Sequence, residues 1–352
     1  MTKYTGAERV FRALERKEPD RVPHFEFGVD PKVRTAILPD ASYEEFIEYM
    51  DWDALVSRDR FFLKEEVLSE NPRITRNEWS VVKRYTKEVT PIPIEAPIKS
   101  EKDLENYQPP DPDAEYRFEQ IRQWVQRYKG ERAIVAFVTD HNSLASDLLD
   151  FSERLMAFYT NPELVLRVHQ IVLDYQRRYI NNVIEAGADI ICIVGDWAYK
   201  NGPMFSSEHY NKFVLPPFKA IVQEAKKGGA YVTKHSDGNC WSFLDDIVEA
   251  GTDAFHPVDP MADMDIGEVK QKYGDRLCLM GNVNCATTLS FATVEEVRRE
   301  TKEVIRKAGV GGGLIISSSN TIHSAVKPEN YLEMVRTIRE YGQYPLDIKA
   351  LN

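Results

Sequence analysis

The stretch EAGADIICIVGDW, residues 185–197, decides the fold class. Its glycine can close a helix in left-handed geometry, and the β-branched apolar run that follows, Ala188–Val194, is typical of a buried strand. The pattern Glu-Ala-Gly-X-Asp recurs at residues 249–253, again directly before a short strand-like run, Asp253–Phe255. A helix-to-strand transition that repeats along a chain predicts parallel strands joined by helical crossovers.

Reading outward from this stretch gives eight candidate strands. They are Arg21–Phe27, Asp53–Ser57, Ala133–Val138, Ala188–Val194, Ala230–Lys234, Asp253–Phe255, Leu277–Met280 and Gly313–Ser317. Amphipathic stretches separate the later strands, and another opens the chain within residues 1–17. We therefore predict a (β/α)8 TIM barrel with an N-terminal helix. A doubly wound open sheet is the alternative, because alternation alone does not prove closure.

One segment does not follow the alternation. Residues 60–112, after the second strand, contain the alternating run Trp79–Val89 and then several prolines. We predict an inserted excursion that carries a β-hairpin and a linker, while residues 1–352 as a whole form a single barrel domain. No GxGxxG or GxxxxGK[ST] phosphate loop accompanies a strand.

Composition excludes several classes of protein. The chain has 352 residues and a net charge of −11, with no stripe of Lys and Arg to neutralise nucleic-acid phosphates. The most apolar stretch, Ala188–Gly195, is far shorter than the roughly 20 residues that span a bilayer. Four cysteines without a paired framework indicate a reducing compartment. We expect a cytoplasmic protein without nucleic-acid or membrane partners. The sequence allows a homodimer but does not require one.

Chemistry in a TIM barrel comes from the C-terminal ends of the strands. Five of the seven histidines fall at or near such ends: His24, His141, His235, His256 and His323. Carboxylates, amides and aromatic residues fall at the same ends: Glu26, Asp196, Trp197, Tyr199, Asp237, Asn282 and Asn320. Imidazole and carboxyl groups that converge on one cavity can transfer protons or bind a metal.

Each of these residues also has a structural interpretation. Asp237 could form an Asx turn with Gly238, and His24 could belong to the core. Trp197 could simply pack. A catalytic zinc ion takes three protein ligands from His, Cys, Asp and Glu. The candidate metal ligands are Glu26, His235 and Asp237, with Asp196 as a further contributor.

Several blocks of the chain, in order, resemble the uroporphyrinogen decarboxylase superfamily. They are GAERVFRAL at 6–14, EPDRVP at 18–23, His235-x-Asp237-Gly238-Asn239, DIVEAG at 246–251, Gly281-Asn282-Val283 and KPEN at 327–330. The resemblance covers nearly the whole chain and implies a TIM barrel. The superfamily includes porphyrinogen decarboxylases and methyltransferases that serve corrinoid proteins, so membership alone does not choose the reaction.

Departures from the family patterns favour one branch. Decarboxylases of the family carry an Arg-rich block that binds substrate propionates, whereas the matching stretch here, Pro23–Asp30, has no arginine and two acidic residues. The thiol-activating methyltransferases use a His-x-Cys pair and a later Cys for zinc. Asp237 and Asn320 stand at those two cysteine positions. The remaining branch is the methyltransferase component of O-demethylases.

That resemblance implies transfer of a methyl group from a methoxylated aromatic to cob(I)alamin on a partner corrinoid protein. Cleavage of the ether needs a proton donor or a metal such as zinc to make phenolate a better leaving group. The catalytic candidates are His235, Asp237, His256 and Tyr199. Candidates for contact with substrate or corrinoid are His24, Asp196, Trp197, Asn282, Asn320 and His323. A decarboxylase, and a corrinoid methyltransferase with a methylamine or thiol donor, are the alternatives.

Overall fold

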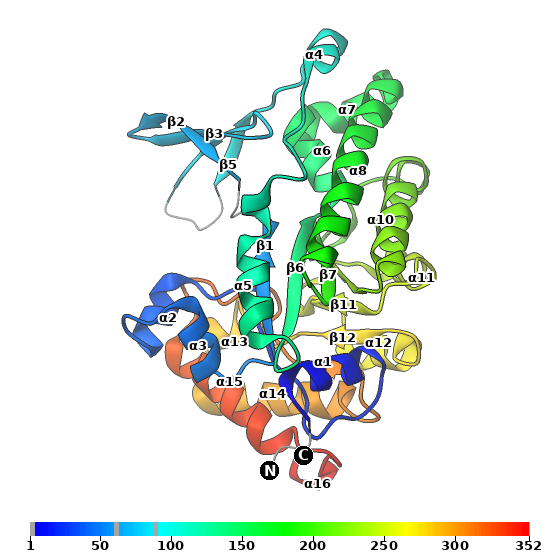
Figure 1. The fold of residues 1–352 in the computed structure, drawn as a ribbon. Helices are drawn as coiled ribbons and strands as arrows, with labels where there is room; N and C mark the ends of the chain where they lie inside the picture. Colours follow the sequence, from blue (N-terminus) through cyan, green and yellow to red (C-terminus); the bar gives the residue numbers. More distant parts are fainter. Residues whose placement is uncertain (1–3, 60–62, 87–90, 352) are drawn as a thin grey trace.

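Seven parallel strands form the central sheet of the protein (Figure 1). The structure is a computed structural model that describes residues 4–59, 63–86 and 91–351. The strands are β1 (Ala54–Arg58), β6 (Ala133–Thr139), β7 (Ile190–Val194), β10 (Tyr231–His235), β11 (Ala254–His256), β12 (Cys278–Met280) and β13 (Leu314–Ile315). Neighbours in space follow one another along the chain, so the sheet lacks the order reversal of a doubly wound fold.

The strand expected at Arg21–Phe27 is wrong as a regular strand, although the chain occupies its place. Only single bridges form there, one of them between His24 and Ile316. Pro23 has no N–H to donate, and the N–H of His24 goes to the Asp53 carboxylate at 2.8 Å instead of a strand carbonyl. The carbonyls of Pro23 and His24 still accept from Ile316 and Asp53, both at 2.9 Å. The segment therefore joins the two edges of the sheet and gives a TIM-barrel-like fold.

Helices surround this sheet (Figure 1). They are α1 (Gly6–Leu14), α2 (Pro31–Ile37), α3 (Tyr43–Tyr49), α4 (Glu101–Asn106), α5 (Glu119–Tyr128), α6 (His141–Leu149), α7 (Phe151–Thr160), α8 (Pro162–Glu185), α9 (Ser207–His209), α10 (Leu215–Lys227), α11 (Leu244–Glu249), α12 (Ile266–Tyr273), α13 (Thr288–Phe291), α14 (Val294–Ala308), α15 (Pro328–Tyr341) and α16 (Ile348–Leu351). Among the described residues, no helix combines the length and apolar character needed to cross a bilayer.

The repeated Glu-Ala-Gly-X-Asp pattern has the same structure at both places. Gly187 and Gly251 adopt φ values of 108° and 92°, which end helices α8 and α11. The aspartates that follow accept the N–H of the second residue of a neighbouring strand: Asp189 from Ile134 of β6 at 2.9 Å, and Asp253 from Val232 of β10 at 2.7 Å. In this pattern the glycine therefore ends a helix, and the aspartate holds the start of the following strand against its neighbour.

The insertion after β1 is more extensive than one hairpin. It contains a four-stranded antiparallel sheet, β2 (Glu65–Glu70), β3 (Arg73–Asn77), β4 (Val82–Arg84) and β5 (Ile92–Glu95). Residues 60–62 and 87–90 of the expected excursion lie outside the described residues. Trp79 fixes this sheet to the barrel, because its ring lies 4.6 Å from the ring of Tyr175 on α8. In Figure 1 the insertion lies at the end of the barrel where α6 and α7 lie, opposite α1.

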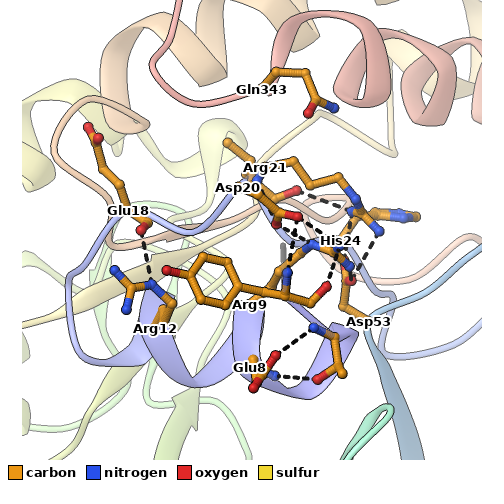
Figure 2. A network of polar contacts seen from close by, with 12 residues as sticks. Glu8, Arg9, Arg12, Glu18, Asp20, Arg21, His24, Asp53 and Gln343 are labelled. Atoms are coloured by element: carbon orange, nitrogen blue, oxygen red, sulfur yellow. Dashed lines mark hydrogen bonds and ion pairs between the residues drawn. The ribbon is translucent and has the colours of Figure 1, made fainter. Parts of the chain in front are cut away.

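A buried ionic network closes the opposite end of the barrel (Figure 2). The Asp53 carboxylate accepts hydrogen bonds from Arg9 Nη1 at 3.0 Å and from Arg21 Nη1 at 2.8 Å, besides the His24 N–H. Asp20 accepts from Arg9 Nε at 2.6 Å. The arginines of the AER and DRVP blocks thus tie α1 and the first segment to β1. Their role here is structural.

Candidate functional site

Polar side chains converge where β7, β10 and β11 end. His235 and His256 are the last residues of β10 and β11, and the pairing register places them level with each other and with Val194 of β7. Side chains level with one another on neighbouring parallel strands point to the same face of a sheet. Asp196 follows β7 and Asp237 follows β10, so two carboxylates border the histidine pair.

The two histidines are hydrogen-bonded to each other. His235 Nδ1 lies 2.7 Å from His256 Nδ1, and His256 Nε2 lies 3.2 Å from Ser317 Oγ. The Phe27 ring packs against His256 with 4.0 Å between ring centroids. Among the described residues, both nitrogens of the buried His256 therefore have hydrogen-bond partners, whereas His235 has one at Nδ1 and none at Nε2.

The free face of His235 points toward carboxylates. Its Nε2 lies 3.8 Å from Asp196 Oδ1 and 3.7 Å from Asp237 Oδ1. The N–H of Asp237 donates to Asp196 Oδ1 at 2.9 Å, and Asn320 Nδ2 donates to Asp237 Oδ2. These contacts bring together four of the residues that the sequence identifies as candidates.

Burial shifts the ionisation of this group. It lowers the pKa of His235 to about 4 and holds the pKa of His256 well below its usual range, where the neighbouring His235 also disfavours a charge. It raises the pKa of Asp237 well above its usual range, and the like charges of Asp196 and Asp259 add to this effect. The site therefore holds neutral imidazoles beside a carboxyl group that retains its proton more readily than a free aspartate.

Three of these residues fit a metal ion. One ligand atom each from Asp196, His235 and Asp237 can be chosen so that all lie within 4.8 Å of one another. Asp237 Oδ1 is buried and has no hydrogen-bond partner among the described residues. A neutral imidazole with two carboxylates is a ligand set that zinc accepts, and such sites commonly leave a position for substrate. The group contains Asp196 where the sequence suggested Glu26.

Glu26 makes polar contacts with residues outside the group of Asp196, His235 and Asp237. Its carboxylate accepts from the Ser318 N–H at 2.9 Å and from Ser318 Oγ at 2.7 Å, and it lies 3.5 Å from His24 Nε2. Both Glu26 and His24 are buried. The pair therefore joins the first segment to the loop after β13 and does not belong to the metal-ligand group.

Four further candidates lie in loops outside the group around His235. Trp197 is fully buried and donates through Nε1 to Asp140 Oδ2 at 3.2 Å. Tyr199 is 53% exposed and lies on the short hairpin β8 (Ala198–Tyr199)–β9 (Gly202–Pro203). Asn282 donates to the Val258 carbonyl at 2.7 Å. His323 Nε2 lies 3.2 Å from the Cys285 carbonyl, so Asn282 and His323 hold loops at the barrel mouth.

Sequence reasoning missed one buried pair beside the site. Lys234 Nζ lies 2.8 Å from Asp140 Oδ2 and 4.1 Å from the centroid of the Trp197 ring. The sequence does contain a signal for this pair, because it places a lysine within the strand that ends in His235. An ammonium group is almost never buried without a partner, so such a lysine predicts a buried acidic residue nearby.

The fold and sequence resemble known proteins of one family. The profile described as Uroporphyrinogen decarboxylase (URO-D) matches residues 82–341. The uroporphyrinogen decarboxylase of Psychromonas ingrahamii is 26% identical over 258 residues, which cover 70% of each chain. That of Alkalilimnicola ehrlichii is 24% identical over 355 residues, covering 95% of this chain and 93% of the relative.

A solved structure shares the fold over almost the whole chain. It is a methyltransferase from Methanosarcina mazei, with a TM-score of 0.75 and 20% sequence identity, and the match covers 96% of this chain and 99% of that one. The family profile spans well over half of the present sequence. The chain therefore belongs to the uroporphyrinogen decarboxylase family.

Proposed function

We propose that this protein transfers a methyl group from a methoxylated aromatic compound to cob(I)alamin carried by a partner corrinoid protein. The observation that carries the proposal is the composition of the barrel mouth: His235 faces two carboxylates, Asp196 and Asp237, and among the described residues the group that could hold a metal contains no cysteine. Oxygen and nitrogen donors suit activation of an ether oxygen better than activation of a thiol. The fold shared with the methyltransferase from Methanosarcina mazei is compatible with this chemistry.

The same mouth argues against porphyrinogen decarboxylation. A substrate with several propionates needs guanidinium partners, but the carboxylates of Asp196 and Asp259 beside Asp237 would repel it. Arg21, in the block that precedes the arginine-free stretch, points to the opposite end of the barrel, where it pairs with Asp53. Membership of the family therefore accounts for the barrel fold, and the acidic residues at the mouth favour the methyltransferase reaction over decarboxylation.

The proposed reaction balances without a further oxidant. The corrinoid cobalt supplies the electron pair that forms the new bond to the methyl carbon. The electron pair of the broken carbon–oxygen bond stays on the phenolate oxygen, which takes up one proton. The protein must therefore orient the ether and neutralise the departing oxygen.

Two assignments of this task are open to the residues of the mouth. The raised pKa of Asp237 lets its carboxyl retain a proton more readily than a free aspartate and deliver that proton to the departing oxygen. Alternatively, Asp196, His235 and Asp237 would hold a zinc ion, which would act as a Lewis acid on the same oxygen. The four cysteines are free and buried. We propose a reducing compartment, the cytoplasm, as the location of the protein.

The test mixes the purified protein with a reduced corrinoid protein and a panel of methoxyarenes. The readout is the change in corrinoid absorbance on methylation, together with the phenol released. We expect transfer with at least one methoxyarene, and a drop of about 10²-fold or more in Asp237→Asn if Asp237 is the acid. Asp275→Asn, an exposed aspartate after α12, is the matched control.

Parallel arms separate the alternatives. Methylamines and methyl thiols replace the methoxyarenes in one arm, and uroporphyrinogen is offered without corrinoid in another. Methyl transfer only from an amine or thiol, or release of CO₂ from uroporphyrinogen, would contradict the proposed substrate class.

A further inference from the structure

We infer that Ser317 and His256 are positioning residues that hold His235 in the Nδ1–H tautomer, so that the lone pair of Nε2 faces Asp196 and Asp237. The inference deepens the proposed function, and its chemical consequence rests on that function. The tautomer itself rests only on the hydrogen bonds of the described residues.

The first step concerns Ser317. Its hydroxyl donates to the Ser318 carbonyl at 2.9 Å, which commits its single proton. The same Oγ lies 3.2 Å from His256 Nε2. Because Oγ has no second proton, it accepts here, and the donor is an N–H on His256 Nε2.

In the second step, the proton position on His256 determines the proton position on His235. A neutral imidazole carries one N–H, so the Nδ1 of His256 has a lone pair once Nε2 holds the proton. The His235 Nδ1 lies only 2.7 Å away and must supply the proton of that hydrogen bond. Two ring nitrogens that lie 2.7 Å apart share a single proton, so only one of the two rings donates in this contact. His235 therefore carries its proton at Nδ1.

The consequence is specific for the chemistry of His235. With its proton committed to His256, its Nε2 can accept a proton or bind a metal, but it cannot donate a proton to a leaving group. A ligating histidine is commonly oriented by a hydrogen bond to its other nitrogen, and His256 and Ser317 would supply this support. Asp237 then remains as the proton donor in the acid-assisted version of the reaction.

The opposite chain of hydrogen bonds is the competing arrangement. If the Ser317 hydroxyl donated to His256 Nε2, then His256 would donate from Nδ1 and His235 would carry its proton on Nε2. The two arrangements differ at every ring nitrogen of the pair, so a measurement of protonated nitrogens separates them.

The experiment uses the full chain with ¹⁵N-labelled histidine, prepared metal-free near neutral pH. Long-range ¹H–¹⁵N correlation spectra distinguish protonated from unprotonated ring nitrogens, and His235→Asn and His256→Asn spectra assign the signals. We expect Nδ1–H for His235 and Nε2–H for His256. Nε2–H for His235 would overturn the inference, whatever the methyltransferase assay shows.

A second measurement tests the part played by Ser317. In Ser317→Ala we expect His235 to show a mixture of tautomers and Zn²⁺ affinity to fall about 10–100-fold in a competition titration. Ser317→Thr keeps the hydroxyl and should restore both readouts. Ser319→Ala is the matched control, because Ser319 is similarly buried on the same loop but contacts Cys285. An unchanged tautomer in Ser317→Ala would remove Ser317 from the mechanism.

The two proposals can fail separately. If the wild-type protein does not bind Zn²⁺, the metal-assisted version of the proposed function is contradicted, while the histidine spectra still decide the tautomer. If methyl transfer is absent but His235 carries Nδ1–H, the positioning inference stands without the proposed function.

Discussion

Lys234 Nζ lies 2.8 Å from Asp140 Oδ2, and both side chains are completely buried. Lys234 directly precedes His235, and Asp140 directly follows β6. Asp140 Oδ2 also accepts from Trp197 Nε1, in the loop that carries Asp196. The ion pair thus connects three strand ends on which the candidate site is built.

Lys234→Met should destabilise the protein by about 3–5 kcal/mol, because it leaves the Asp140 carboxylate buried without its cation. The measurement is the free energy of unfolding from denaturant titration at neutral pH. The double variant Lys234→Met/Asp140→Asn should recover part of the loss. Losses that simply add in the double variant would show that the two side chains do not depend on each other.

Asp53→Asn should destabilise the protein by a similar amount, about 3–5 kcal/mol, since Arg9 and Arg21 lose the buried carboxylate that they share (Figure 2). Asp51→Asn is the control. Asp51 also pairs with Arg21 but is 54% exposed, so its replacement should change the free energy of unfolding by less than about 1 kcal/mol. Equal losses in the two variants would contradict the structural role assigned to Asp53.

The second half of the fold could be predicted from the sequence because local signals agree there. Glycines at the helix ends and apolar strand runs indicate the same alternation there, and α8 and α11 end just before the glycines of the repeated pattern. The segment Arg21–Phe27 has the composition of a strand, but Pro23 and the carboxylate of Asp53 interrupt its ladder. Asp53 comes from a distant part of the chain, so a local pattern cannot show this interruption.

The candidate site was predictable to the level of strand ends. That rule correctly brings His235, His256, Asp196 and Asp237 to one place. It does not tell which way a loop side chain turns. Glu26 follows the same rule, but its carboxylate is bound by Ser318. Side-chain direction depends on contacts between loops from distant strands, and the sequence does not display them.

Acid should destabilise the protein between about pH 6.5 and pH 4, in part through His141. Burial lowers the pKa of His141 to about 4, against about 6.5 in an unfolded chain. Between these values the unfolded state binds more protons, so the free energy of unfolding falls as the pH falls and levels off below about pH 4. This histidine accounts for up to about 3 kcal/mol of the loss.

The check for His141 compares unfolding free energies of the wild type and His141→Gln from pH 7.5 to pH 4. The variant has no titrating ring at this position, so its stability should depend less steeply on pH. The other buried histidines remain in both proteins, and only His169, whose pKa is lowered by burial and also by a charge on His141, should change its contribution with the replacement. Parallel curves would show that His141 does not titrate differently on folding.

Gly238→Ala should displace the loop that carries Asp237. Gly238 has a φ of 88°, and an added Cβ would lie 2.6 Å from the Ala198 carbonyl oxygen. Gly229→Ala is the matched control, because Gly229 has a similar φ of 83° but open space around the position of a Cβ. Both variants should lose about 1 kcal/mol from backbone strain. Gly238→Ala should lose more free energy of unfolding than Gly229→Ala and should also lose methyl transfer. Equal losses in the two variants, with normal methyl transfer, would contradict the conclusion that the nearby Ala198 carbonyl excludes a side chain at position 238.

Asp196→Asn should abolish measurable Zn²⁺ binding if Asp196, His235 and Asp237 are the ligands, because a neutral amide replaces one of two carboxylates in the group. Glu26→Gln tests the ligand set that includes Glu26. The structure commits the Glu26 carboxylate to Ser318, so this variant should lose stability but keep a Zn²⁺ affinity near that of the wild type. Isothermal titration of the metal-free proteins measures both. Loss of binding in Glu26→Gln with normal binding in Asp196→Asn would move the metal to the first segment and away from the loop after β7.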